Sequence, residues 1–256
     1  MSYLSHLLID LGDNPDRPRP ARLWLRNRYH VHQRLCMAFP SAKLVIDDPF
    51  FLSPFSPDNF DSRQVKTARD TDSGFLFRID PQPGSKAVIL VQSAIAPNWQ
   101  YAFQNTPLMP FIQMREETRS FTIGERFRFR LEANPTKRLR EGSLHPNGEK
   151  INSQWVGKRV PVPTDQMDDW LTRRATGSGF LVEKITNFVP GYAFVGKSSH
   201  SIKENLPRSL KDQLRAVRYE GILEVTDSDK MTGTIISGIG PAKAFGFGLL
   251  SLVKMT

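Results

Sequence analysis

The chain has 256 residues, a formal net charge of +9 and a single cysteine, Cys36. This length allows one large domain or two smaller ones, each with a buried core. One cysteine excludes an internal disulfide and a cysteine-based metal cage, and no apolar run approaches the roughly 18 residues of a membrane-spanning helix. The positive charge favours a polyanionic partner, because basic side chains replace the counterions of a nucleic acid. A single cysteine also fits a reducing compartment, so we expect a cytoplasmic protein, and the absence of a long apolar run leads us to expect no membrane partner.

The first half of the chain alternates between strand and helix periodicity. Residues 41–73 interrupt this series, since their many Pro, Asp and Ser residues indicate a long irregular excursion. The expected elements are, in chain order, a strand over 3–9, a helix over 21–39, strands over 74–79 and 87–91, a short helix over 98–104 and a strand over 112–121.

The second half of the chain repeats this order. Residues 126–131 alternate strictly between Arg and apolar residues, which places three arginines on one face of a strand. Thr164 is a candidate N-cap for the helix that follows. The further expected elements are a helix over 165–176, strands over 180–188 and 216–225, a helix over 227–237 and a final strand over 245–253.

Two copies of the order strand, helix, strand, strand, helix, strand predict an α+β protein. This order is that of the ferredoxin-like fold, so we expect a tandem arrangement of two such domains. The boundary should fall near residues 118–124, which gives an N-terminal domain over 1–120 and a C-terminal domain over 121–256. The two halves differ in charge, since residues 1–120 hold 14 Lys/Arg and 12 Asp/Glu, and the remainder hold 21 and 14. A basic surface is therefore expected on the second half.

Two residues of the helix over 21–39 are candidates for chemistry. Tyr29 and His32 stand three residues apart, so their side chains are neighbours on a helix. The more frequent role of such a histidine is that of a half-buried structural residue, whereas His30 is expected to be exposed. An imidazole beside a phenol, with Arg22 and Arg26 on the polar side of the same helix together with Gln33, also suits metal-free proton transfer. Such a set fits cleavage of RNA by its own 2′-hydroxyl.

No metal or cofactor is expected. No pair of the five histidines has the further ligands of a zinc site, because the chain holds a single cysteine, Cys36, and no HExxH motif. The sequence also contains no GxSxG, Walker or protein-kinase motif.

The closing segment is rich in glycine around Lys243. Glycines allow backbone N–H groups to approach an anion closely, and the lysine adds charge at the same place. The alternative is a tight helix-to-strand connection in which the glycines only turn the chain. The glycines concerned are Gly238, Gly240, Gly246 and Gly248.

Residues 126–160 form the most basic part of the chain, with nine Lys/Arg and three Asp/Glu. A strand, a turn and a second strand here would present five cations on one projecting ribbon; the alternative is a hairpin whose cations only keep it solvated. These cations are Lys137, Arg138, Arg140, Lys158 and Arg159. A third basic patch comprises Lys197, Lys203, Arg208, Lys211 and Arg215.

Four segments of the chain form a recognisable series: Tyr3-Leu4-Ser5, Tyr29-His30-Val31-His32-Gln33, the segment from Phe129 to Lys137, and Gly238 to Leu252. At these places the sequence resembles the CRISPR-associated endoribonucleases of the Cascade type (the CasE family), which process repeat RNA. The closing loop and the Asn-Pro-Thr-Lys segment are the most specific of them, and the resemblance spans the whole chain in order.

The resemblance implies two ferredoxin-like domains that face each other across a cleft. It also implies a repeat stem-loop as substrate, cleavage at the 3′ base of the stem, and a protein that stays on its product with other Cascade subunits. His32 would be the catalytic histidine and Tyr29 its companion. The ribbon around residues 137–159 would enter the major groove of the stem and contact phosphates, because that groove is too deep and narrow for base readout.

Two other functions stay open from the sequence. A non-catalytic subunit that binds an RNA hairpin would use the same cations, with His32 purely structural. A DNA-binding architectural protein would show the same basic charge, since charge alone does not distinguish RNA from DNA.

Overall fold

The computed structural model describes most of both halves of the chain. The excursion predicted over residues 41–73 lies outside the described residues, as do Lys197, Lys203, Arg208 and Lys211 of the third basic patch. Among the described residues, no helix is long and apolar enough to cross a membrane. The described residues are 2–12, 20–39, 74–104, 106, 108, 110–142, 150, 152–196 and 212–255.

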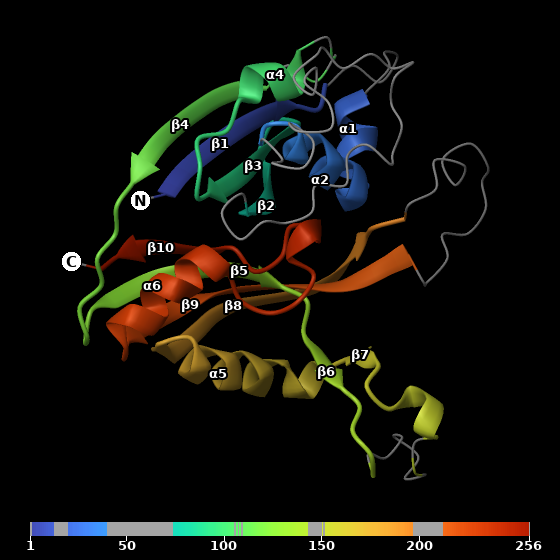
Figure 1. The fold of residues 1–256 in the computed structure, drawn as a ribbon, viewed down its shortest axis with the longest axis vertical. Coiled ribbons are helices and arrows are strands. Elements are labelled where there is room, and N and C mark those ends of the chain that lie inside the picture. Colours follow the sequence, from blue (N-terminus) through green and yellow to red (C-terminus); the bar gives the residue numbers. More distant parts are fainter. Residues whose placement is uncertain are drawn as a thin grey trace, which may run out of the picture.

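The first half folds into an antiparallel sheet with helices on one face (Figure 1). Its strand order is β2-β3-β1-β4. Residues alternate between the two faces, so Leu7 and Ile9 of β1 are fully buried against Val31 and Leu35 of α2. The elements are β1 (Ser2–Asp10), α1 (Pro20–Leu25), α2 (Arg28–Cys36), β2 (Phe75–Gln82), β3 (Lys86–Ser93), α4 (Trp99–Phe103) and β4 (Phe111–Glu117).

The second half contains another antiparallel four-stranded sheet, with the order β10-β5-β9-β8. Its core lies between the sheet and α5 and α6. A separate two-stranded hairpin, β6–β7, projects away from this sheet at the lower right of Figure 1. The elements are β5 (Arg126–Ala133), β6 (Thr136–Arg138), β7 (Arg159–Pro161), α5 (Met167–Gly177), β8 (Phe180–Phe194), β9 (Gln213–Val225), α6 (Ser228–Ser237) and β10 (Leu250–Lys254).

The helix predicted over 21–39 is wrong in one respect, because it is broken at Asn27. Asn27 is extended (φ −114°, ψ 101°) and caps α2, its Oδ1 accepting a hydrogen bond from the Tyr29 N–H at 3.1 Å. Gln33, expected on the polar side, is buried. α2 contacts β8 and the Lys243–Phe245 turn of the second half, so the side of the helix that faces away from its own sheet is also covered.

The final strand also differs from its predicted bounds. It begins at Leu250 and not at residue 245. Lys243–Phe245 form a 3-10 turn, and Gly246 and Gly248 have φ values of +78° and +89°. A left-handed backbone conformation is incompatible with a strand, so the chain extends only after the second of these glycines.

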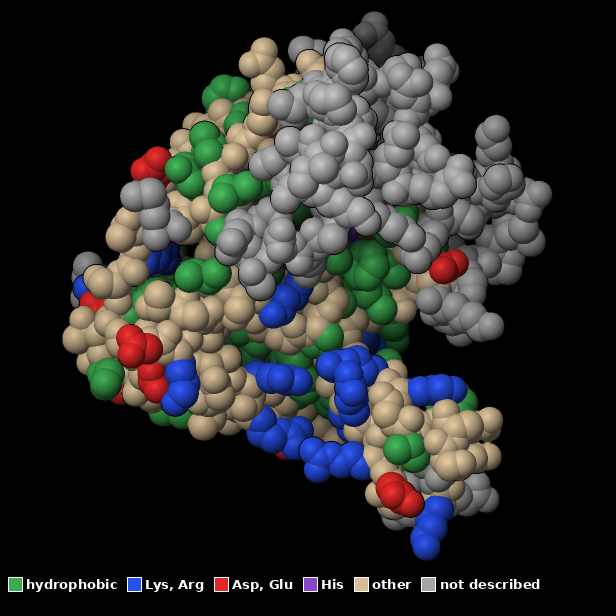
Figure 2. Space-filling model, viewed as in Figure 1, with side chains coloured by type: hydrophobic (Ala, Val, Ile, Leu, Met, Phe, Trp, Pro, Cys, Tyr) green, Lys and Arg blue, Asp and Glu red, His purple; other side chains and the backbone are tan. Residues whose placement is uncertain are grey.

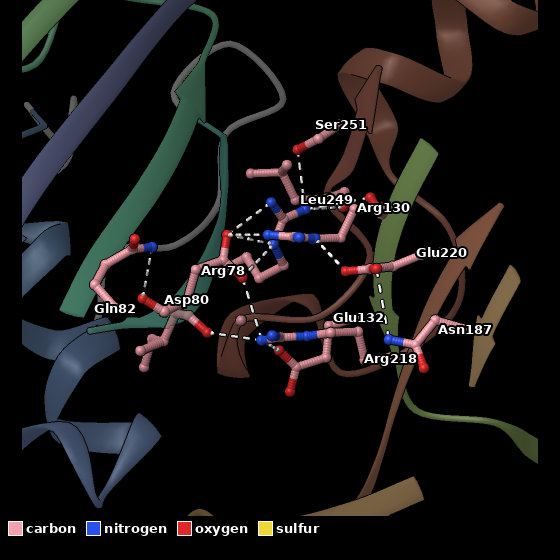
Figure 3. Close-up of polar contacts among 12 residues, drawn as sticks. Arg78, Asp80, Gln82, Arg130, Glu132, Asn187, Arg218, Glu220, Leu249 and Ser251 are labelled. Atoms are coloured by element: carbon pink, nitrogen blue, oxygen red, sulfur yellow. Dashed lines mark hydrogen bonds and ion pairs between the residues drawn. The ribbon is translucent and has the colours of Figure 1, made fainter. Parts of the chain in front are cut away.

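The open faces of the two sheets meet through a buried ion-pair network (Figure 3). Arg78 of β2 donates two bonds of 3.0 Å from Nε and one of 2.8 Å from Nη2 to the Asp80 carboxylate. Its Nη1 reaches the second half, donating to Ser251 Oγ at 2.9 Å. Arg218 of β9 approaches Asp80 at 3.2 Å and Glu132 at 3.6 Å. The network therefore fixes β2 against β5, β9 and β10.

Asp80 is held as a carboxylate in this network. Burial alone would raise its pKa, but the hydrogen bond from Arg78 and the charges of Arg78, Arg218 and Arg130 outweigh burial and lower the pKa. Folding stability from Asp80 is therefore present above the ordinary carboxyl pKa. It is lost as pH falls through the lowered value.

The substitution Asp80→Asn should lower the free energy of unfolding by about 3–5 kcal/mol, because it leaves the buried Arg78 guanidinium without its carboxylate. Urea denaturation at neutral pH measures this loss. The variant should also lose less stability than the wild type as pH falls below about 4, where Asp80 of the unfolded wild type begins to protonate while the native carboxylate, with its lowered pKa, still resists protonation.

The matched control is Arg115→Gln, because its ion pair with Glu117 lies on the surface, with the Arg115 side chain 66% exposed. We expect a far smaller change for this variant. Equal effects of the two substitutions would contradict a structural role for the buried network.

Candidate functional site

His32 lies on α2 with its ring stacked against two phenylalanines of β2. The ring centroid is 5.6 Å from that of Phe75 and 6.4 Å from that of Phe77, and the Phe77 ring is only 12° from parallel. Its Nε2 lies 3.5 Å from Cys36 Sγ. These contacts fix the plane of the imidazole while leaving the residue half-buried.

Tyr29 and His30 lie one turn earlier on the same helix. Tyr29 is half-buried, and its ring centroid is 6.0 Å from that of His30. The sequence predicts an exposed His30; the residue is instead half-buried, and burial lowers its pKa. Arg26, in the junction between α1 and α2, is exposed to solvent.

The N-terminus of α2 is attached to the second half of the molecule. The buried Asn27 amide donates a 2.8 Å hydrogen bond to Gly196 O, and the backbone of Asn27 forms a bridge with Phe194 at the end of β8. One side chain therefore caps the helix with its oxygen and anchors it to the other half with its nitrogen.

Arg28 makes a second link from α2 to the closing segment. Its guanidinium pairs with the buried Glu132 carboxylate and donates to Phe245 O at 3.2 Å. It also lies over the Phe247 ring, 4.7 Å from the centroid. Glu132 in turn accepts a 2.8 Å bond from the Gly248 N–H at its backbone oxygen. Arg28 and Glu132 thus clamp the glycine-rich loop beside α2.

Close packing accounts for the glycines of this loop. A Cβ on Gly246 would lie 2.8 Å from the Phe77 ring, and one on Gly238 would lie 2.8 Å from Leu76 Cδ1. A Cβ on Gly240 would approach the Trp170 ring to 3.0 Å, and one on Gly248 would meet Ile239 O at 2.7 Å. These distances explain why only glycine fits.

The N–H groups of Gly238, Gly246 and Gly248 donate to protein carbonyls. These three are therefore committed to the fold, and an anion-binding role of the loop stays a prediction that depends on Lys243 and the remaining N–H groups. Gly246 and His32 contact the same Phe77 ring, so the loop and α2 form one site.

The predicted basic ribbon is present as the β6–β7 hairpin. Lys137 pairs with Val160 and Arg138 with Arg159 across its strands. Figure 2 shows Lys and Arg side chains gathered along the hairpin and over the adjoining α5. The predicted cations of this hairpin, all exposed, are Lys137, Arg138, Arg140, Lys158 and Arg159.

Cations on the sheet and on the hairpin differ in their partners. Arg126 of β5 binds the Glu183 carboxylate, and Arg130 binds Glu220 at 2.6 Å. Within the described part of the chain, Lys137, Arg138, Lys158 and Arg159 form no ion pair; Lys158 lies over the Trp155 ring, and Arg159 bonds the Thr136 hydroxyl. The hairpin charge is therefore available to an external anion.

The sequence did not reveal Arg28, Phe77 and Glu132, which assemble this site. Arg28 directly precedes Tyr29, and Glu132 is the one acidic residue on a strand of arginines. Each position was therefore unusual enough in the sequence to be noticed as a candidate site residue. Their pairing joins segments a hundred residues apart. Among the described residues, no group of three or more His, Cys, Asp or Glu is placed to hold a metal ion.

Comparisons with known proteins place the chain among CRISPR proteins. A family model described as "CRISPR associated protein" matches residues 2–254. The chain is 31% identical over 245 residues to the CRISPR-associated endoribonuclease Cse3 of Thermus thermophilus, covering 91% of this chain and 93% of that protein. It is 28% identical to the CRISPR system Cascade subunit CasE of Escherichia coli, covering 99% and 100%.

A solved structure supports the same likeness. The structure of Thermus thermophilus Cse3 bound to an RNA that represents a pre-cleavage complex matches with a TM-score of 0.64 and 26% identity. The match covers 98% of each chain. The likeness therefore extends over both halves.

The substitution Gly246→Ala should lower the free energy of unfolding by about 1–3 kcal/mol, because the new Cβ meets the Phe77 ring at a left-handed backbone position. Gly233→Ala in α6, where a Cβ meets nothing within 4 Å, is the matched control and should raise stability slightly. Chemical denaturation compares the two. Two-dimensional NMR should also show shifted His32 ring signals in Gly246→Ala only; unchanged signals would mean that the loop does not position this ring.

Proposed function

We propose, from the fact that this chain belongs to the family of CRISPR-associated proteins, that it is an endoribonuclease that cleaves CRISPR repeat RNA. The observation that carries the proposal is the likeness to an endoribonuclease over 91% of the chain. The proposal agrees with the position of the half-buried His32 beside the glycine-rich loop that Arg28 and Glu132 hold in place. It agrees also with Lys137, Arg138 and Lys158 of the hairpin, which form no ion pair with any described residue.

We further propose that the two halves are tandem ferredoxin-like domains, over residues 1–120 and 121–256, that face each other across a cleft. Both sheets support this, because each places its first strand between its third and fourth and its second strand at an edge. A hollow of about 380 Å³ is lined by Leu4 and His6 from the first sheet and by Arg130 and Leu252 from the second.

The proposed reaction needs no metal. The 2′-oxygen of one nucleotide attacks the adjacent phosphorus, its proton leaves to a base, and the 5′-oxygen of the next nucleotide departs with a proton from an acid. The products are a 2′,3′-cyclic phosphate and a 5′-hydroxyl. His32 serves as the general acid or base, and Tyr29 orients the reacting groups. Neighbouring cations offset the charge that develops on the phosphorane.

The hairpin cations Lys137, Arg138, Arg140, Lys158 and Arg159 bind phosphates of the repeat stem in this proposal. An A-form major groove admits few side chains to the bases, so phosphate contacts are the expected mode. Arg26 directly precedes Asn27, the N-cap of α2, and Lys243 lies in the glycine-rich loop that packs beside this helix. In this proposal both cations hold RNA near His32. Lys197 is a further proposed contact, in a segment outside the described residues.

Retention of the product would follow from the same contacts, since cleavage at the base of the stem leaves the stem phosphates in place. The name of the Escherichia coli relative, a Cascade subunit, supports partnership with other Cascade subunits. A cytoplasmic location is part of this proposal, because that is where such RNA is made.

A second candidate is a non-catalytic subunit that binds the same RNA hairpin. The stacking of His32 on Phe75 and Phe77 favours it, because these contacts are also those of a structural histidine. It predicts binding without any cleaved product.

The substitution His32→Ala should reduce single-turnover cleavage of the host repeat RNA about 10²- to 10⁴-fold while leaving binding nearly unchanged. Gel analysis in EDTA measures cleavage, and end-group analysis of the fragments checks for the cyclic phosphate. A repeat with a 2′-deoxy nucleotide at the cleavage position should stay intact with the wild type.

His30→Ala serves as the control, since it removes a half-buried imidazole two residues away on the same helix. Full cleavage by a folded His32→Ala protein would assign the chemistry elsewhere. No cleavage by the wild type in EDTA or in magnesium would favour the binding subunit.

The double substitution Arg138→Gln/Arg159→Gln should weaken binding of the RNA hairpin. It should also reduce the slope of log affinity against log salt by about one for each phosphate that the variant no longer neutralises. Fluorescence anisotropy at several salt concentrations measures both. Arg126→Gln is the control, because Glu183 already neutralises that guanidinium; an equal effect of the control would place the RNA on the sheet and not on the hairpin.

A further inference from the structure

One aromatic ring of the second half is both exposed and rigidly held. Tyr192 of β8 is 66% exposed, and its cross-strand partner is Arg215 of β9. The Arg215 guanidinium lies 5.1 Å from the centre of the Tyr192 ring, and its Nη1 donates a 2.6 Å hydrogen bond to the tyrosine oxygen. The tyrosine hydroxyl thus accepts a bond at one end, and its own proton stays available to a ligand.

Arg215 is itself fixed from the other side. Its Nη2 donates to Thr164 Oγ1 at 2.7 Å, so the guanidinium is held between two hydroxyl oxygens. Its Nε is buried and has no hydrogen-bond partner among the described residues. An unsatisfied buried donor has a free-energy cost, and a mobile surface arginine would avoid that cost by turning outward. The hydrogen bonds to Tyr192 and Thr164 and the contact with the ring hold the guanidinium beside Tyr192, and we call this pair the platform.

The platform lies between the two parts of the site already described. Thr164 follows the end of β7 at Pro161, so Arg215 reaches the base of the cationic hairpin. Phe194, two residues after Tyr192 on the same strand, forms the backbone bridge with Asn27, the N-cap of the helix that carries Tyr29 and His32. RNA that runs from the hairpin to α2 would pass this strand.

We propose that Tyr192, backed by Arg215, is a stacking site for an unpaired nucleobase of the RNA beside the stem. This rests on the proposed function. Bases inside the stem already stack on each other, so only an unpaired base has a free face. An aromatic side chain can stack with any base, and the guanidinium beside the ring offers a positive charge to the adjoining phosphate.

Phe111 is an exposed aromatic residue with no described guanidinium against its ring, and it can be compared with Tyr192. Phe111 of β4 is 63% exposed, but in the described residues no guanidinium lies against its ring. Single exposed apolar side chains of this kind are common on protein surfaces. Phe111 therefore provides a control of similar exposure on the other half of the molecule.

The test uses repeat hairpins that carry the fluorescent base 2-aminopurine at single unpaired positions on either side of the stem. The full-length protein with His32→Ala keeps the RNA intact. Binding should quench 2-aminopurine at one position through stacking. Adding Tyr192→Leu should abolish the quenching and weaken binding about 5- to 150-fold, Tyr192→Phe should retain the quenching, and Phe111→Leu should change neither.

Outcomes that overturn the stacking site differ from those that overturn the proposed function. Wild-type protein that cleaves the repeat RNA, combined with no quenching at any unpaired position, would exclude the site whether or not any Tyr192 variant folds. Equal affinity of Tyr192→Leu and Phe111→Leu would exclude it as well. Absence of cleavage and of binding by the wild type would instead contradict the proposed function itself.

Discussion

The ion pair between Arg78 and Asp80 determines how the two sheets meet. Both side chains are almost fully buried, so their charges require the hydrogen bonds that surround them. Arg78 is bonded on one side to its own strand and on the other to β10, whereas Asp80 also binds Arg218 of β9. Directional bonds of this kind specify one relative placement of two faces that apolar contact alone would leave free to slide. The positions of α2 and of the closing loop both depend on this placement.

Local patterns in the sequence were sufficient for most elements of the fold. The alternation of Arg and Phe from 126 to 131 specified a strand with one charged face, and the structure shows that strand with those arginines on its open side. Leu35 and Val31 were expected on the apolar face of their helix and are buried there. The two basic strands around residues 137 and 159 were expected as a ribbon and form one. Each of these features depends on neighbours in the chain, which is why periodicity could reveal it.

Features that depend on distant partners were not predictable in the same way. The break at Asn27 exists because its side chain bonds both Tyr29 and Gly196, and the second partner comes from the other half of the chain. The hydrogen bond from Arg28 to Phe245 O likewise joins α2 to a partner in the other half of the chain. The glycines of the closing loop carried a local signal, but their neighbours, Phe77 and Trp170, lie on a strand and a helix far away in the sequence. A local sequence pattern can therefore show that a glycine is required at a position, but it cannot show which distant residue the glycine contacts.

The clamp between Arg28 and the closing loop also sets when the site can form during synthesis. The first sheet and α2 are complete once residue 117 has been made, whereas the loop that packs on Phe77 begins at Gly238. Domains generally fold in the order in which they are synthesised, so a nascent chain would hold a folded α2 with its Arg28 side unoccupied until the last strand joins. Contacts of such long sequence separation form late in folding. A chain synthesised only as far as residue 237 therefore carries His32 without an assembled site around it, and RNA near the ribosome meets the assembled site only after residues 238–248 have been made.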